Sequence, residues 1–287
     1  MPNSYVSRRS TEAQAFSAWS PPTGVLGSLT DEAHRRAATL QTRSAELHRL
    51  AEAVAPAPKF GTALRRSNVA VIAEVKRSSP SKGSINPGLA VEDQVIAYER
   101  GGAAAISILT EPTRFSGSNA DLTAARATCS LPLLKKDFHV DSLQIVEAKA
   151  LGASAALVIV RAVAPTRLRE LIDTGRSVGI ELLIEVRDEN ELQLALAFGA
   201  EVIGVNNRDL ETLEIDSTTA TRLLPLIPET VIAVAESGMK TVDDVRAVAA
   251  AGADAVLVGS ELSASANPEA AVGALSAAKR SVRAGKG

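Results

Sequence analysis

The sequence has little cysteine, few aromatic residues and almost no net charge. Of its 287 residues one is a cysteine, Cys129, and 3% are aromatic. A single cysteine excludes an intramolecular disulfide and a metal site built from several cysteines, and it is typical of a protein of the reducing cytoplasm. The formal net charge of −2 leaves no overall field to attract nucleic acid or an anionic membrane, so we expect neither partner.

Long hydrophobic runs and clusters of metal-binding residues are missing as well. No apolar stretch reaches the ~20 residues of a membrane helix, and the N-terminus has no compact hydrophobic signal segment, so we expect a cytoplasmic protein. The histidines His34, His48 and His139 are scattered, which argues against a metal site or a Ser-His-Asp triad. We expect His34 and His48 on the surface, His139 in a solvated loop, and Cys129 as a buried structural thiol.

Short apolar runs are what the chain has in abundance. From about residue 69 they alternate eight times with longer amphipathic stretches, the pattern of repeated βα units. Such units can close on themselves, and barrels of this kind commonly run to ~250 residues, so the sequence predicts a (β/α)8 TIM barrel rather than an open sheet. No Gly-x-Gly-x-x-Gly follows the first run, which weakens the dinucleotide-binding alternative. The predicted strands are 69–76, 103–109, 131–136, 154–160, 181–186, 202–207, 231–236 and 254–259.

The helices between these strands carry recognisable ends. A Gly-Ala pair that follows a helix recurs before four of the strands, as in Leu151-Gly-Ala-Ser-Ala, and predicts tight turns at the bottom of the barrel. Predicted helices include 91–100, 142–151, 165–177, 189–198 and 241–251. We expect residues 1–24 to be a flexible segment and 25–287 to form one barrel domain with an N-terminal helical extension at about 28–53. Pro56–Gly61 would then be a linker, and the extra helix could close the bottom of the barrel or cover its top.

Polar residues end most of the predicted strands, as in Val71-Ile-Ala-Glu-Val-Lys76. A buried strand needs no charge at its end unless that end opens onto a site, and in a barrel the carboxyl ends of all strands converge on one face. A coupled set of lysines and carboxylates there can hold an acid protonated or a lysine neutral near pH 7. The residues that this reasoning brings together are Glu74, Lys76, Lys136, Glu185, Asn206, Arg208, Glu236, Ser237, Gly259 and Ser260.

Two regions on this face favour an anionic ligand. The loop Arg77–Gly88 is rich in hydroxyls, glycine and proline, which is typical of a lid in which Ser79 or Ser81 donates to an anion. A solvated loop is the alternative, equally compatible with Ser81 and Lys82. After the last two strands, the segments 236–238 and 258–260 end in small residues that leave backbone N–H groups open, at the usual phosphate position of this fold.

Taken together, these motifs closely resemble the indole-3-glycerol phosphate synthase family over residues 60–262. The resemblance implies conversion of 1-(2-carboxyphenylamino)-1-deoxyribulose 5-phosphate to indole-3-glycerol phosphate with loss of CO2 and water. It implies neither a metal nor an organic cofactor, and a small substrate that carries a carboxylate and a phosphate. The segments that carry the resemblance are Ile72-Ala-Glu-Val-Lys-Arg-Ser-Ser-Pro-Ser-Lys-Gly83, Leu133-Leu-Lys-Lys-Asp-Phe138, Leu183-Ile-Glu-Val186, Ile203-Gly-Val-Asn-Asn-Arg-Asp-Leu210 and Ala235-Glu-Ser-Gly238.

The resemblance also implies a role for each site residue. Lys136 resembles the general acid that protonates the ribulose carbonyl, and Glu185 the residue that stabilises or deprotonates the developing iminium. Glu74 would assist dehydration, and Lys76 would hold the substrate carboxylate and serve as a second acid. Asn206, Arg208 and Ser237 would surround the carboxylate and the hydroxyls; Ser79, Gly238, Gly259 and Ser260 the phosphate; and Phe115, Phe138, Leu157, Leu210 and Glu236 the remaining walls.

Some points and some rival functions stay open at this level. Strand alternation lets only one of Lys135 and Lys136 point inward, and the following Asp137-Phe138 favours Lys136. Gly259-Ser260-Glu261 departs from the Gly-Glu of many relatives. An isomerase on the same barrel, an aldolase with a Schiff-base lysine and a barrel that binds a sugar phosphate without turnover are the alternatives, and we expect a monomer or a weak homo-oligomer.

Overall fold

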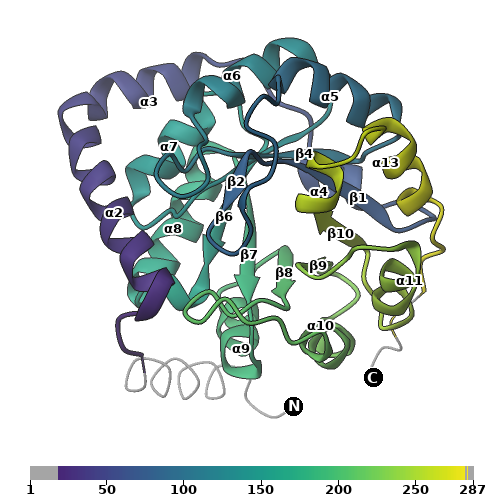
Figure 1. The fold of residues 1–287 in the computed structure, drawn as a ribbon. Coiled ribbons are helices and arrows are strands. Elements are labelled where there is room, and N and C mark those ends of the chain that lie inside the picture. Colours follow the sequence, from purple (N-terminus) through teal and green to yellow (C-terminus); the bar gives the residue numbers. More distant parts are fainter. Residues whose placement is uncertain (1–18, 282, 284–287) are drawn as a thin grey trace.

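The computed structural model describes residues 19–281 and residue 283, and its centre is a closed barrel of eight parallel strands (Figure 1). The order around the barrel is β1-β10-β9-β8-β7-β6-β5-β4. All eight predicted strands are present, with ends that differ by at most two residues from the prediction, so the (β/α)8 barrel is confirmed. The strands are β1 (Ala70–Val75), β4 (Ala105–Leu109), β5 (Leu133–Lys136), β6 (Ala155–Ile159), β7 (Glu181–Val186), β8 (Val202–Asn206), β9 (Ile232–Glu236) and β10 (Ala255–Val258).

Helices surround the barrel, and their ends follow the predicted signals. The side chains of Asp141, Asp188 and Thr241 each cap the helix that follows. The glycines of the four Gly-Ala turns all have positive φ, as a tight turn after a helix requires. The helices are α5 (Val91–Arg100), α6 (Asn119–Thr128), α7 (Ser142–Ala150), α8 (Pro165–Val178), α9 (Glu189–Ala197), α10 (Thr218–Leu223), α11 (Val242–Ala250), α12 (Ser260–Ser263) and α13 (Pro268–Ser276), with 3-10 turns η2 (Val160–Ala162) and η3 (Leu224–Leu226).

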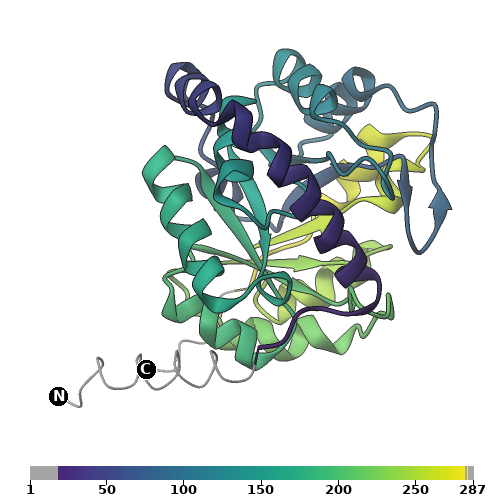
Figure 2. The same cartoon turned by 90° about the vertical axis from the view of Figure 1, so that its left-hand side faces the viewer.

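The N-terminal extension differs from the single helix predicted at 28–53. It consists of α2 (Gly24–Leu40) and α3 (Ser44–Ala53), separated by the 3-10 turn η1 (Gln41–Arg43). Helix α3 packs on α7, and α2 crosses the outside of the barrel, as Figure 2 shows. Residues 1–18 of the predicted flexible segment lie outside the described residues, whereas the Thr23 backbone N–H donates to Glu211 at 2.5 Å.

The bottom of the barrel is covered by a short helix that begins inside the region predicted as a linker and extends beyond it. Helix α4 (Phe60–Leu64) begins at Phe60, whose side chain is fully buried. The backbone N–H groups of Phe60 and Gly61 donate to Glu181 at 2.6 and 3.0 Å, and Glu181 is the first residue of β7. The linker prediction for Pro56–Gly61 was therefore wrong at its end, because an aromatic anchor pins the chain beneath the strands. Helix α2 instead reaches loops at the opposite, C-terminal face.

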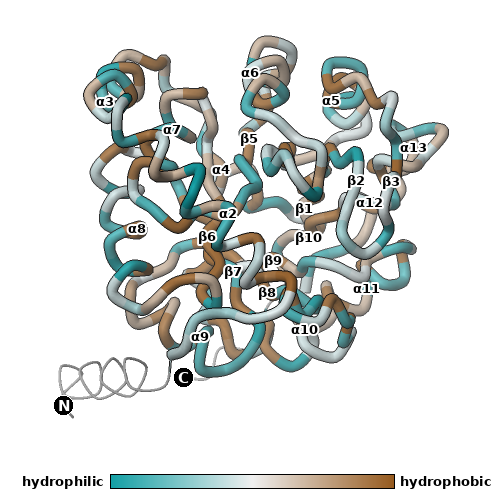
Figure 3. Tube along the Cα trace, turned by 60° about the vertical axis from the view of Figure 1, so that its left-hand side comes forward, coloured by the Kyte–Doolittle hydropathy of each residue, from teal (hydrophilic) through white to brown (hydrophobic). Residues whose placement is uncertain are grey.

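The core is aliphatic, and Figure 3 shows the most hydrophobic segments in the central strands. Cys129 is buried, while His34 and His48 are exposed, all as predicted. His139 was expected in a solvated loop but is 2% exposed, with Nδ1 2.6 Å from the carbonyl oxygen of Leu157. Burial lowers the pKa of His139 to about 3, so this side chain is neutral. Among the described helices, none is long and apolar enough to cross a membrane.

Candidate active site

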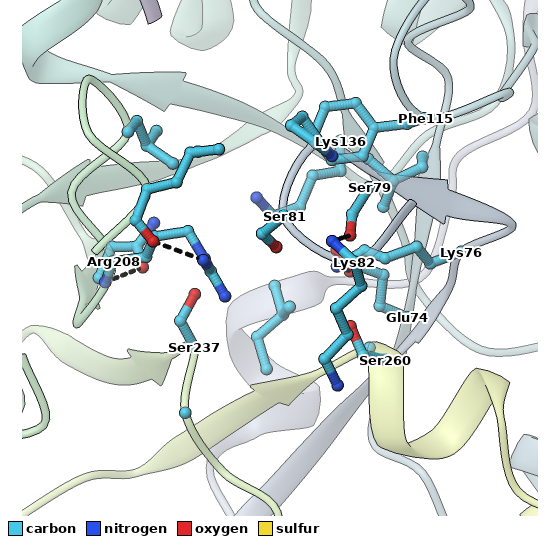
Figure 4. A pocket seen from close by; sticks show the side chains of 18 of the residues that line it. Glu74, Lys76, Ser79, Ser81, Lys82, Phe115, Lys136, Arg208, Ser237 and Ser260 are labelled. Carbon is cyan, nitrogen blue, oxygen red and sulfur yellow. Dashed lines mark hydrogen bonds and ion pairs between the residues drawn. The ribbon is translucent and has the colours of Figure 1, made fainter. Parts of the chain in front are cut away.

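A cavity opens at the carboxyl ends of the strands, where the sequence predicted the site (Figure 4). The structure brings together on its wall every predicted site residue except Glu185 and Glu236, which lie buried at 3% and 1% exposure. Figure 4 shows Lys76, Lys82 and Ser260 on one side of the cavity and Arg208 on the other. The predicted residues on the wall are Glu74, Lys76, Ser79, Phe115, Lys136, Phe138, Leu157, Asn206, Arg208, Leu210, Ser237, Gly238, Gly259 and Ser260.

Lys136, the last residue of β5, occupies the centre of an acidic cluster. Its Nζ lies 3.7 Å from Glu185 Oε2 and 3.7 Å from Glu236 Oε2. Burial alone would lower the pKa of Lys136, but the charges of Glu185 and Glu236 outweigh it and raise the pKa above its ordinary value. Lys136 therefore carries a positive charge. The neighbouring Lys135 points outward and pairs with Glu147 at 3.2 Å, which confirms the prediction that Lys136 faces inward.

A second lysine and carboxylate pair forms at the end of β1. Lys76 Nζ contacts Glu74 Oε1, and Ser107 on β4 donates to Glu74 Oε2 at 3.4 Å. Gly259 faces this pair, because a Cβ at that position would lie 2.2 Å from Glu74 Oε1 and 2.9 Å from Lys76 Nζ. The glycine after β10 thus leaves room for both side chains. A lysine beside a buried carboxylate can hold an anion and can exchange a proton with its partner.

Strand β8 supplies the polar groups that hold Glu185 and Arg208. The Asn206 amide donates to Glu185 Oε1 at 2.8 Å, and the Arg208 backbone N–H donates to Asn206 Oδ1 at 2.9 Å. The Arg208 guanidinium also donates to the Leu213 carbonyl oxygen at 2.7 Å. Burial lowers the pKa of Arg208. This hydrogen-bonded chain fixes Glu185 beneath the cavity and leaves the guanidinium on its wall.

Glu236 lies deeper than the sequence suggested, since we expected it on a wall of the substrate site. Neither of its carboxylate oxygens has a hydrogen bond within the described residues. It fits because β8 carries a glycine opposite it: a Cβ on Gly204 would lie 2.0 Å from Glu236 Oε1. Burial, and then the charge of Glu185, raise the pKa of Glu236 to about 8. Glu236 therefore lies directly beneath Lys136, 3.7 Å from its Nζ.

Small residues and open backbone surround the end of the cavity between β9 and β10. Ser237 and Gly238 have φ of 63° and 88°, an unusual conformation for the serine. Ser79 starts the turn of the hairpin made by β2 (Ser78–Ser79) and β3 (Gly83–Ser84), and its hydroxyl accepts from the Lys82 backbone N–H at 3.2 Å. These residues present the small side chains and hydroxyls that the sequence predicted for an anion.

The remaining wall of the cavity is apolar, and two of its residues, Val25 and Leu29, were not predicted from the sequence. Phe115 and Phe138 lie with their ring centroids 6.3 Å apart, next to the predicted Leu157 and Leu210. Val25 and Leu29 of α2 complete this wall, so the N-terminal extension contributes directly to the cavity. The helical spacing of apolar residues in 24–40 indicates that one face of this helix is buried, but it does not indicate which part of the protein that face packs against. The wall forms a slot suited to an aromatic ring.

A polar cluster beside Lys136 was also missed. Arg36 of α2 donates to Asp137 at 2.7 Å, and the Thr110 hydroxyl donates to the other Asp137 oxygen at 2.8 Å. Asp137 is 6% exposed and accepts from the Phe138 backbone N–H at 2.8 Å. The cluster fixes the loop between the predicted acid and the predicted ring wall. In the described parts of the chain, no set of three or more His, Cys, Asp or Glu side chains could hold a metal ion.

Comparisons with known proteins agree with this geometry. A family model described as Indole-3-glycerol phosphate synthase matches residues 28–275. Indole-3-glycerol phosphate synthase 2 of Streptomyces coelicolor is 47% identical over 248 residues, which cover 85% of this chain and 96% of the relative. The synthase of Mycolicibacterium vanbaalenii is 50% identical over 219 residues, 76% of this chain and 80% of the relative. A solved structure of thiamine phosphate pyrophosphorylase from Pyrococcus furiosus shares the fold alone, with a TM-score of 0.55 at 15% identity over 74% of this chain and 95% of that one.

Proposed function

Since the chain belongs to the indole-3-glycerol phosphate synthase family, we propose that the cavity at the strand ends is its active site. The chain is a carboxy-lyase of tryptophan biosynthesis that acts on a small phosphorylated substrate. Its reaction closes the indole ring of 1-(2-carboxyphenylamino)-1-deoxyribulose 5-phosphate and releases CO2 and water. The observation that carries the site assignment is one charged lysine, Lys136, held 3.7 Å from two buried carboxylates at the cavity floor.

Lys136 is the general acid in this proposal. As an ammonium at the cavity wall, it donates a proton to the ribulose carbonyl oxygen while the aromatic ring carbon attacks the carbonyl carbon. The apolar slot of Phe115, Phe138 and Leu210 holds the ring and keeps water away from the breaking carboxylate bond. A low-dielectric wall on one side and a fixed charge on the other favour the loss of CO2.

Dehydration then uses the carboxylates and the second lysine. Glu185, oriented by Asn206, stabilises or deprotonates the developing iminium; the iminium that ring closure creates is neutralised when the electron pair of the broken carboxylate bond returns to the ring and CO2 leaves. The pair of Glu74 and Lys76 assists departure of the hydroxyl group as water, and Lys76 first holds the substrate carboxylate. Arg208 and Ser237 bind near the carboxylate and the ribulose hydroxyls. Each of these groups lies on or directly beneath the cavity wall, which supports a shared role.

The phosphate binds at the opposite end in this proposal. Ser79 donates its hydroxyl, and the backbone N–H groups around Gly238, Gly259 and Ser260, which line the same cavity, receive the phosphate. Cationic side chains and backbone donors on one cavity wall fit a substrate with a carboxylate and a phosphate. We further propose a cytoplasmic enzyme that works as a monomer or a weak homo-oligomer, which light scattering behind a sizing column would test.

One assay tests the function. The purified chain is mixed with 1-(2-carboxyphenylamino)-1-deoxyribulose 5-phosphate, and growth of indole fluorescence is followed. We expect turnover without added metal or cofactor. Borohydride added during turnover would trap a lysine only if the reaction ran through a Schiff base, so the absence of an adduct is expected. Measurable substrate binding with no fluorescent product would overturn the assignment of a catalytic site.

A further inference from the structure

An ion pair links the tip of the β2-β3 hairpin to the residue next to the proposed phosphate end. Lys82 Nζ lies 2.8 Å from Glu261 Oε1. Both residues line the active cavity, although the hairpin follows β1 and Glu261 belongs to α12, after β10. Figure 4 shows Lys82 beside Ser260, the neighbour of Glu261. The Lys82 ammonium group therefore contacts the residue that directly follows Ser260, whose backbone is proposed to bind the phosphate.

The pair is too weak to be explained as a stabilising contact. The side chains of Lys82 and Glu261 are 47% and 40% exposed. Exposed ion pairs of this kind contribute little to folding, because water and salt screen them and two long side chains lose freedom. Such a pair is easily exchanged for a stronger partner. A phosphate group near neutral pH carries close to two negative charges and three acceptor oxygens, whereas Glu261 carries one charge.

The hairpin is built so that its tip can hold Lys82 over this end. The Ser79 hydroxyl accepts from the Lys82 backbone N–H at 3.2 Å, and Gly83 follows with a φ of 64°. On the opposite side, Arg77 at the base of the loop pairs with Asp121 at 2.7 Å, which anchors the hairpin to α6. The base is thus fixed while the lysine at the tip has a single exposed partner among the described residues.

From these contacts we propose that Glu261 is a placeholder for the substrate phosphate and that Lys82 is a phosphate-binding residue. When the phosphate enters, Lys82 leaves Glu261 and donates to a phosphate oxygen, so no bond other than hydrogen bonds changes. Glu261 opposes binding twice, because it competes for Lys82 and repels the dianion. This inference rests on the proposed function, since it deepens the assignment of the phosphate end. It gives Lys82 and Glu261 opposite effects on affinity.

Inorganic phosphate is the direct probe, used as a competitive inhibitor of the full-length enzyme and in calorimetric titration. We expect Glu261→Gln to tighten phosphate binding and lower the substrate KM by about threefold to tenfold, and Lys82→Met to weaken both by about tenfold, since a charge-assisted hydrogen bond is lost. The value of kcat should change much less than KM. Raising the ionic strength should shrink both effects. Glu170→Gln and Lys149→Met are matched controls for charge, far from the cavity wall.

The double variant Lys82→Met with Glu261→Gln separates the proposal from simple neutralisation. If Lys82 only shields Glu261, removing the lysine costs nothing once the carboxylate is gone. If Lys82 contacts the phosphate, the double variant still binds phosphate about tenfold more weakly than Glu261→Gln alone, which is the expected result. Equal affinities of these two variants, or unchanged phosphate binding in Glu261→Gln, would overturn the proposal. Absence of turnover in the unmodified chain would instead overturn the proposed function.

Discussion

Replacing Lys136 by methionine tests the centre of the proposed mechanism. Methionine keeps most of the length of the side chain but removes the ammonium that donates the proton. A positioned general acid contributes ~10²- to 10⁴-fold to the rate, so kcat should fall by at least ~10²-fold. Indole fluorescence under saturating substrate measures this loss, and Lys149→Met, a lysine of α7 outside the cavity wall, is the control.

Substrate binding should survive this change, and the structure explains why. At 3.7 Å, each of the two carboxylates attracts Lys136 by about 4 kcal/mol at an effective dielectric constant of ~20, before the cost of desolvation. Removal of the ammonium also removes the charge that lowers the pKa of Glu236, so this group keeps its proton in the variant. In the proposal, Lys76, Arg208 and the residues at the phosphate end hold the anionic groups of the ligand, so the dissociation constant of the product should stay within tenfold. A kcat near that of the unmodified chain would refute the role of Lys136.

Three further changes test the packing and charge around this site. Glu236→Gln tests the raised pKa of Glu236. Between the usual glutamate range and about pH 8 the folded unmodified chain holds one more proton than the unfolded chain, so its free energy of unfolding falls as pH rises, by up to ~1.4 kcal/mol per pH unit. The variant should lose this slope, and equal slopes for the two proteins in urea melts at pH 5 to 8 would count against the assignment. Gly204→Ala places a Cβ 2.0 Å from Glu236 Oε1, so we expect ~1–3 kcal/mol of destabilisation and a lower kcat, and a variant with unchanged melting and kcat would contradict the close approach. Arg283→Ala breaks a buried pair with Asp254 at 2.8 Å, so unfolding free energy should drop by ~3–5 kcal/mol in denaturant titration while kcat at low temperature stays the same; a loss below ~1 kcal/mol would show that the pair is not important for stability.

The sequence could predict the cavity because barrel closure leaves few choices. Once eight βα units are recognised, every strand end must lie on one face, and alternation decides which of two adjacent lysines points inward. Lys136 and Lys135 follow this rule: the first reaches Glu185 and Glu236, and the second reaches Glu147. No knowledge of side-chain detail is needed for such a result, because it depends on backbone geometry alone.

Positions set by long-range packing could not be predicted in the same way. His139 is buried because the loop after β5 folds back onto the Leu157 carbonyl of β6, a contact between segments that neither local sequence announces. Phe60 was predicted to lie near the end of a proline-rich linker, but its ring is fully buried in the core beneath the strands. The side of the barrel that α2 covers was likewise decided by Arg36 and Asp137, a pair separated by 101 residues. In each case a contact between residues far apart in the sequence fixes the position of a whole segment.

The electrostatics of the cluster suggest how the acid is kept ready. An ideal general acid has a pKa near the working pH, but the carboxylates around Lys136 raise its pKa and make it a weaker acid. The cluster keeps Lys136 charged before the substrate binds. Its proton then leaves only when the carbonyl oxygen gains negative charge during ring closure, since an oxygen that becomes an alkoxide is a far stronger base than the carbonyl. Burial raises the pKa of Glu236 to about 8, so this group largely keeps its proton at neutral pH and limits the negative charge buried beneath Lys136. In the proposed mechanism, the cluster therefore keeps Lys136 charged until ring closure needs its proton.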